Sequence, residues 1–176
     1  MNISSDEKLN FLFSRRSIRV YSPGHIGDQL VNKLLETAMA APSAMTRDPW
    51  RFVIVRNPES LAQLAVALPG GKMLSTAALA IVVCGDLDIA LDRQLGFLVQ
   101  DCSAAIENLL LGAHALGLGA CWVGVYPSED PMRRLKEMLS LPAPVIPIAA
   151  ISIGHPGEQP EPRTRYNRDY VHFEKW

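Results

Sequence analysis

The sequence predicts an α+β protein with an α/β three-layer arrangement, in which a mixed, mainly antiparallel sheet lies between helices. Three observations predict it. Strand and helix patterns alternate along the 176 residues, one long helical segment is almost wholly apolar, and periodicity ends after Gly154. The length, with 48% apolar and 20% charged residues, fits a single domain over residues 1–176.

The first predicted elements are two helices with an extended segment between them. Ser4 and Glu7 have the spacing of a capping box, which opens a short helix. Residues 18–21 are expected to be extended. Asp28 is the expected cap of a second helix, which Pro42 stops because proline cannot continue a helix.

The middle of the chain predicts two strands around a helix. Residues 51–55 form the first strand, and Asn57-Pro58 opens a helix that runs to about Ala67. Residues 79–84 are apolar throughout, so we expect a strand that is buried on both faces.

A long helix is predicted from Leu95 to Leu116, where only Asp101, Glu107 and His114 are titratable and Gly117 supplies the end signal. Because this helix is apolar nearly all round, it is either a central helix or the seam of a dimer. We expect both, since so long an apolar helix needs more covering surface than this chain provides.

The C-terminal part predicts a strand at 121–125, a helix capped by Ser128 and a strand at 145–153. Beyond Gly154, prolines alternate with polar residues and predict an extended tail. The tail carries four aromatic residues that need an apolar surface, which a neighbouring subunit would supply: Tyr166, Tyr170, Phe173 and Trp176.

The composition limits the classes of partner. A formal net charge of −1 and a pI near 6.4 argue against general binding of nucleic acid or a membrane surface. The longest apolar run, residues 77–84, is too short to cross a bilayer, and the polar N-terminus does not resemble a secretory signal, so a cytoplasmic protein is expected. The three cysteines are expected to be buried and reduced, and no metal site is expected.

Arginines are concentrated at the two ends of this nearly neutral chain. Arg15, Arg16 and Arg19 follow the first helix, and Arg163 and Arg165 lie in the tail. Guanidinium groups match phosphate oxygens in pairs and stay charged at any working pH. If folding brings the two ends together, they form a site for a small phosphate-bearing ligand.

The ordered set of motifs resembles the FMN-dependent nitroreductase family, specifically its short branch, over nearly the whole chain. The motifs are Arg15-Arg16-Ser17-Ile18-Arg19, Ala41 to Trp50, Lys72-Met73-Leu74, Gln100 to Asn108, Gly117 to Gly124, Gly154-His155-Pro156 and Arg163-Thr164-Arg165. The resemblance implies a homodimer with FMN at the subunit interface, bound by residues of both chains.

The resemblance also implies roles for single residues. Arg15, Arg163 and Arg165 would hold the FMN phosphate, while Arg16 and Ser17 would serve the phosphate and the ribityl hydroxyls. Arg19 and Lys72 would approach the N1/O2 edge of the ring, where a cation favours reduction because negative charge accumulates there.

Two further segments are expected at the flavin. The segment Pro42-Ser43-Ala44 would reach the flavin of the other subunit, and Gly124 would let the flavin face approach the backbone. Ser43 lacks the surroundings of a catalytic nucleophile, and no side chain is expected to act as a covalent nucleophile or general acid.

The chain departs from the family pattern at two positions near the ring. Thr46 and Asp48 stand where the family commonly has Asn and Gln. An ionised Asp48 accepts from flavin N3–H but cannot donate to O4, and it opposes negative charge on the reduced ring. Either Asp48 points away from the flavin ring, or it lowers the reduction potential of the flavin.

The brief connection at 86–94 predicts a more open substrate pocket.

The function expected is an FMN-dependent oxidoreductase that takes hydride from NADH or NADPH and reduces a nitroaromatic, quinone or similar conjugated electrophile by a ping-pong mechanism. The alternative is an FMN-binding protein of the same fold used for flavin consumption, dehalogenation or ligand sensing. A Rossmann dehydrogenase is disfavoured, because the glycines from Gly117 to Gly124 precede a strand rather than opening a helix.

Overall fold

The computed structural model describes residues 4–176, so the polar positions 1–3 and that part of the predicted domain lie outside the described residues. The structure is built on a five-stranded sheet in the order β1-β5-β3-β2, with β4 also paired to β5. All strand pairs are antiparallel, which confirms the predicted sheet. The strands are β1 (Tyr21–Ser22), β2 (Trp50–Val55), β3 (Leu79–Asp86), β4 (Gly119–Gly124) and β5 (Val145–Pro156).

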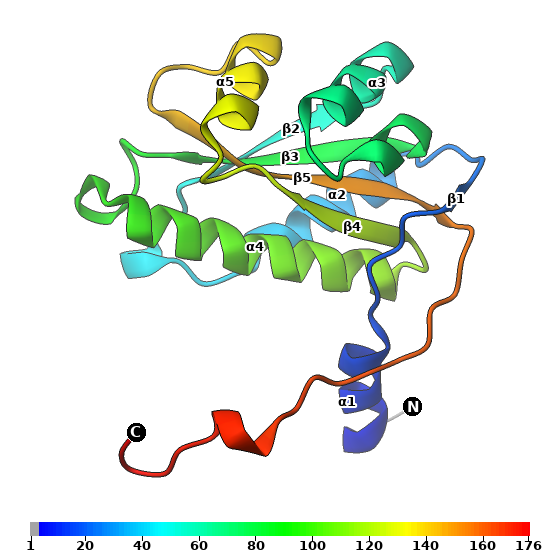
Figure 1. The fold of residues 1–176 in the computed structure, drawn as a ribbon, viewed down its shortest axis with the longest axis vertical. Coiled ribbons are helices and arrows are strands. Elements are labelled where there is room, and N and C mark those ends of the chain that lie inside the picture. Colours follow the sequence, from blue (N-terminus) through cyan, green and yellow to red (C-terminus); the bar gives the residue numbers. More distant parts are fainter. Residues whose placement is uncertain (1–3) are drawn as a thin grey trace.

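The helices cover the sheet on both faces, as Figure 1 shows, with α2 and α4 on one side and α3 and α5 on the other. Each face has its own apolar core, and the apolar strand β3 contributes to both because its side chains alternate between faces. The predicted three-layer arrangement is therefore confirmed. The helices are α1 (Ser5–Ser14), α2 (Asp28–Met39), α3 (Pro58–Ala67), α4 (Leu95–Ala115) and α5 (Glu129–Met138).

Three of the four predicted helix caps are confirmed and one is wrong; of the three, Ser128 occupies the N-cap position of α5 without a side-chain cap bond. The Ser4 hydroxyl accepts from Glu7 N–H at 3.2 Å, and the Glu7 carboxylate accepts from Ser4 N–H at 2.7 Å, which completes the capping box. The Asn57 side chain caps α3. Asp28, however, is not the cap of α2: Gly27 occupies that position. Asp28 lies in the first turn, where its charge favours the helix dipole, and pairs with Arg56 at 2.7 Å.

Helix α4 packs against α2 and the sheet with nine buried residues, and its end is set by Gly117. Gly117 has φ +70°, and the next amide, Leu118 N–H, donates back to Ala113 O at 2.8 Å. This is the left-handed (αL) helix ending that glycine favours, so the predicted end of the helix is confirmed.

None of the helices in residues 4–176 is long and apolar enough to span a membrane.

Two segments extend away from the three layers, and they lie on the same side of the molecule (Figure 1). Helix α1 has no buried residues, and the tail beyond Pro156 runs past it in extended form with one short 3-10 turn, η4 (Arg168–Tyr170). The tail aromatics, Tyr166, Tyr170, Phe173 and Trp176, are all exposed in the single chain. The described part of their own subunit therefore leaves most of their surface uncovered.

Candidate functional site

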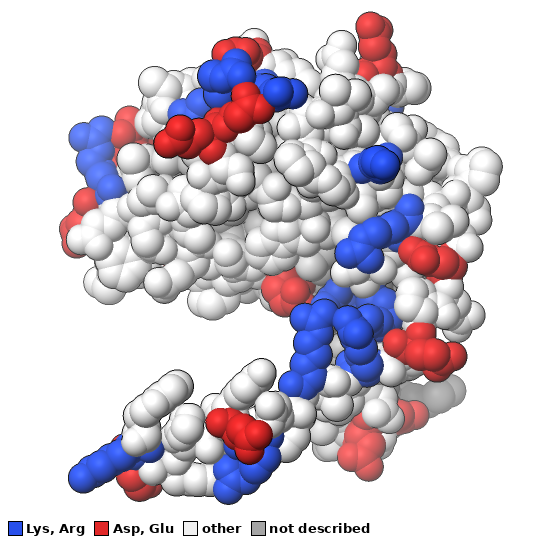
Figure 2. All heavy atoms as spheres, in the orientation of Figure 1, with Lys and Arg blue, Asp and Glu red and all other residues white. Residues whose placement is uncertain are grey.

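The arginines of the two chain ends come together. Burial, followed by the positive charges of Arg163, Arg15 and Arg165, lowers the pKa of the Arg16 guanidinium. Such an influence requires the four side chains to lie near one another. Figure 2 shows basic side chains gathered where the N-terminal segment and the tail leave the body of the molecule. We call Arg15, Arg16, Arg163 and Arg165 the arginine cluster.

The cluster forms because both segments are attached to neighbouring strands. Ile18, which follows the first arginines, is buried, and its N–H donates to Ala120 O of β4 at 2.9 Å. On the tail side, Gly157 N–H donates to Val20 O at 2.8 Å as the chain leaves β5. Because β4 pairs with β5, these two bonds fix both segments to the same end of the sheet.

Glu158 joins the two segments just beside the cluster. Its carboxylate accepts from the backbone N–H groups of Arg19, at 2.5 Å, and Val20, at 3.0 Å. These bonds lower the pKa of Glu158, because they stabilise its charged form. The tail is thereby tied to the segment that carries Arg15 and Arg16.

The cluster is only partly neutralised by the chain itself. Arg15 Nε lies 3.3 Å from Glu107 Oε1 of α4, while Arg16 Nε is buried without a hydrogen-bond partner among the described residues. Within residues 4–176, no ion pair involves Arg163 or Arg165. An excess of closely placed guanidinium groups is suited to an anion with several oxygens, such as a phosphate. A cavity of about 920 Å³, lined in part by Arg15 and Arg16, adjoins the cluster.

His114 connects α1 to the cluster. Its Nε2 lies 2.8 Å from Ser14 Oγ, and its ring stacks on Phe11 with centroids 4.9 Å apart. Burial and the charge of Arg15 lower the pKa of His114. Both partners of the His114 ring are therefore supplied by α1.

Residues 42–48, which we call the switchback loop, are held by hydrogen bonds to the side chains of Ser43, Asp48 and Asp101. Asp48 N–H donates to Ser43 Oγ at 3.0 Å, and Ser43 Oγ in turn donates to the Asp48 carboxylate. Ala44 N–H donates to Asp101 Oδ1 of α4 at 2.9 Å. The Asp48 carboxylate is therefore engaged by its own loop, which favours the first of the two alternatives predicted for it.

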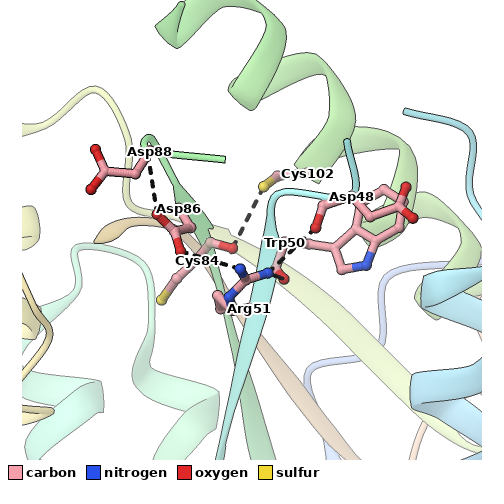
Figure 3. Close-up of polar contacts among 7 residues, drawn as sticks. All are labelled: Asp48, Trp50, Arg51, Cys84, Asp86, Asp88 and Cys102. Atoms are coloured by element: carbon pink, nitrogen blue, oxygen red, sulfur yellow. Dashed lines mark hydrogen bonds and ion pairs between the residues drawn. The ribbon is translucent and has the colours of Figure 1, made fainter. Parts of the chain in front are cut away.

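The end of the switchback loop is fixed to the sheet, as Figure 3 shows. The Arg51 guanidinium donates to Asp48 O at 3.3 Å and pairs with Asp86 Oδ2 at 3.2 Å. Asp86 N–H also donates to Pro49 O at 2.8 Å, so the loop exit and the end of β3 are bonded twice.

The switchback loop and the arginine cluster are not bonded within one chain. The loop contacts α4 at Asp101 and the cluster contacts α4 at Glu107, about 9 Å further along the helix axis. No hydrogen bond or ion pair among the described residues joins the two groups. The predicted site residues thus fall into two separate groups in the single subunit.

Three further predicted site residues lie beside or on β4 and on a short helix. Ser17 forms a parallel bridge with Ala120, which places it against β4. Lys72 begins the short 3-10 helix η2 (Lys72–Thr76) and is exposed, and no ion pair within residues 4–176 involves it. Gly124 ends β4, and a Cβ built there would meet no atom within 4 Å. The backbone at Gly124 is therefore open to a flat partner.

Three carboxylates that contact predicted site residues were not predicted from the sequence to do so: Glu107, Glu158 and Asp101. Asp101 and Glu107 are two of the few charged residues on an otherwise apolar helix, and this sequence feature could have identified them.

Cys84, Cys102 and Cys121 are buried and free as predicted, and burial raises the pKa of Cys84 to about 12. In the described part of the chain, no group of three or more His, Cys, Asp or Glu residues could hold a metal ion.

The chain is similar over nearly its whole length to known proteins of one family. The model of the nitroreductase family matches residues 12–71 and 66–155. A Methanothermobacter thermautotrophicus protein, described as a candidate NADH dehydrogenase/NAD(P)H nitroreductase, is 43% identical over 99% of this chain and 90% of its own length. A crystal structure of a Bacteroides thetaiotaomicron candidate of the same description has a TM-score of 0.91 at 35% identity and covers 98% of this chain and 100% of that chain. A Desulfovibrio desulfuricans candidate nitroreductase, solved in complex with FMN, has a TM-score of 0.82 at 30% identity and covers 96% of both chains.

Proposed function

The chain belongs to the nitroreductase family, and from this premise we propose that it is an NAD(P)H-dependent FMN oxidoreductase whose arginine cluster holds the FMN phosphate. The observation that carries the proposal is the convergence of Arg15, Arg16, Arg163 and Arg165 from opposite ends of the chain. A similar protein, from Desulfovibrio desulfuricans, was solved in complex with FMN. We also propose that residues 1–176 form one FMN-binding domain.

The residues present fit this cofactor. Arg16 Nε is buried without a partner within the described residues. The pKa of Arg16 is lowered by burial and then by the neighbouring arginines, and a phosphate dianion would offset both effects. Among the described residues, Arg15 is the one member of the cluster that forms an ion pair, with Glu107 at 3.3 Å. Ser17 lies next to the cluster on the edge of β4, where it would serve the phosphate and the ribityl hydroxyls.

Further residues would shift the reduction potential of the flavin ring or support its face. Arg19 and Lys72 would lie at its N1/O2 edge, where positive charge stabilises the reduced form, and the open backbone at Gly124 would support its face. When bound, FMN accepts a hydride equivalent from NADH or NADPH and passes the electrons to an acceptor. The chain's own residues position the cofactor and set its electrostatic surroundings; none is assigned as a covalent nucleophile or general acid.

We propose that the working unit is a homodimer, because the single chain leaves parts of the site apart. The switchback loop has no bond to the arginine cluster of its own subunit among the described residues, and the exposed tail aromatics need a surface to cover. In a dimer, Pro42, Ser43 and Ala44 of one copy would reach the FMN held by the arginines of the other.

The acceptor that we propose is a nitroaromatic, a quinone or a similar conjugated electrophile. The connection between β3 and α4 is short, containing only the small 3-10 helix η3 (Leu91–Arg93). A short connection covers little of the surface near the start of α4, which is consistent with an open pocket. Since both substrates would use the same place in turn, we expect ping-pong kinetics with parallel double-reciprocal plots.

Two measurements test the function. The purified protein should show the absorbance bands of a flavin with about one FMN per chain, and anaerobic NADH or NADPH should bleach them. Bound FMN that neither nicotinamide reduces would favour the alternative, an FMN-binding protein used for sensing or another flavin reaction. Protein that is colourless and does not bind added FMN would contradict both.

A further inference from the structure

Asp101 is the one charged residue that is buried within residues 4–176, with 5% of its surface exposed. It lies on the otherwise apolar helix α4. Its Oδ1 accepts from Ala44 N–H at 2.9 Å, and its Oδ2 is buried without a hydrogen-bond partner among the described residues. A buried carboxylate with one unsatisfied oxygen opposes folding stability. Its presence therefore calls for a role other than stabilising the core.

The contact that Asp101 makes is with a strained segment. Met45, Thr46 and Asp48 of the switchback loop have φ values of 51°, 54° and 49°, in the left-handed region that non-glycine residues seldom adopt. Backbone of this kind persists only where its surroundings hold it in place, and it is typical of functional sites. Three such residues within four positions require several restraints.

The restraints on the switchback loop come from three directions. Within the loop, Ser43 and Asp48 bond to each other, and at its exit Arg51 and Asp86 bond it to the sheet. Near the start of the loop, Ala44 N–H donates to the Asp101 carboxylate. Without that bond, the Ala44 amide would lose its partner while the rest of the loop stayed attached.

We propose that Asp101 is a positioning residue, which holds the start of the switchback loop in the shape from which Pro42, Ser43 and Ala44 contact the flavin. This inference rests on the proposed function. The charge of the carboxylate strengthens the bond to Ala44 N–H, since hydrogen bonds to ionised acceptors are shorter and stronger than neutral ones. Asp101 itself does not need to touch the cofactor.

The test compares Asp101→Ala and Asp101→Asn with a matched control, Cys102→Ala. Cys102 is the next residue of α4, is also buried, and makes a side-chain contact with Cys84 O on β3 at 3.6 Å rather than with the loop. Three quantities are measured on the full-length protein: the FMN dissociation constant, the hydrogen-exchange rate of the Ala44 amide before FMN is added, and the melting temperature.

Asp101→Ala is expected to speed exchange at Ala44 and to raise the FMN dissociation constant by at least about tenfold, the size of a lost hydrogen bond to a charged group. Asp101→Asn, whose carbonyl can still accept from Ala44 N–H, is expected to restore the dissociation constant to within about threefold of the wild-type value. Cys102→Ala is expected to lower the melting temperature without changing FMN affinity.

Two results would overturn the proposal: unchanged FMN affinity and unchanged Ala44 exchange in Asp101→Ala, or a loss of affinity in Cys102→Ala as large as in Asp101→Ala. If Asp101→Ala does not fold, the decision rests on Asp101→Asn: wild-type exchange at Ala44 with wild-type affinity supports the proposal, and altered exchange with wild-type affinity overturns it. If the wild-type protein does not bind FMN, the proposed function fails, while Ala44 exchange still shows whether Asp101 holds the loop.

Discussion

Replacing Arg165 with alanine tests the arginine cluster most directly, because this side chain comes from the tail and is not part of the core. A charge-assisted hydrogen bond contributes ~1.5–3 kcal/mol, so losing one should raise the FMN dissociation constant by about 10- to 150-fold. The same change removes one of the charges that lower the pKa of Arg16. The protein without FMN should therefore not lose stability, since the repulsion within the cluster is reduced.

The assay is a titration of FMN into the protein, followed by flavin fluorescence at two salt concentrations. Added salt should weaken binding more in the wild type than in Arg165→Ala, because the wild type has more exposed charge to be screened. Arg168→Ala is the matched control. Arg168 lies on the same tail but stacks on Phe173, 4.8 Å from the ring centroid, and does not act on Arg16.

The reasoning is refuted if Arg165→Ala and Arg15→Ala both keep wild-type FMN affinity. It is equally refuted if Arg168→Ala weakens binding as much as Arg165→Ala does, since the loss would then come from the tail in general. A melting temperature that falls in Arg165→Ala without FMN would show that the cluster is not under repulsion.

The remaining predictions concern the strand end, the sheet junction and the helix contact. Gly124→Ala should leave the melting temperature unchanged, since no atom lies within 4 Å of the added methyl group, but should weaken FMN binding; unchanged affinity would exclude this strand end as the flavin platform. Tyr21→Phe should cost about 1–3 kcal/mol in urea unfolding, because the Tyr21 hydroxyl lies 2.7 Å from Ser152 Oγ in a largely buried site; a loss near zero would contradict this. His114 has its pKa lowered from 6.5 by burial and by the charge of Arg15. The unfolded chain therefore binds the proton more readily, and stability should fall as the pH drops below 6.5. His114→Gln should reduce this slope in melting curves from pH 5 to 8, and an unchanged slope would refute the assignment.

Features set by neighbouring residues could be predicted from the sequence. The capping box of Ser4 and Glu7, the cap at Asn57 and the helix end at Gly117 depend on spacings of a few positions. Asp28 shows the limit of such rules: it is a good capping residue, but Arg56 lies nearby in the fold and holds its carboxylate, while the adjacent glycine takes the cap position.

The candidate site could be predicted in part. The arginines stand out because the chain is otherwise nearly neutral, but their meeting depends on the bond between Ile18 and Ala120, which no local pattern encodes. Glu107 and Glu158 could not be assigned for the same reason, since each contacts a residue far away in the sequence. Local residue chemistry thus indicated the kind of ligand, and long-range contacts determined the geometry.

The attachment of the tail to β5 has a consequence for how the protein acquires its ligand during synthesis. Arg15 and Arg16 emerge from the ribosome early, whereas Arg163 and Arg165 follow the strand that pairs with three others and must be made before the sheet can close. A nascent chain lacking β5 and the tail holds only Arg15 and Arg16 of the four residues in the arginine cluster. If the cluster holds the FMN phosphate, as proposed, the complete site for the cofactor forms only after β5 and the tail have been made.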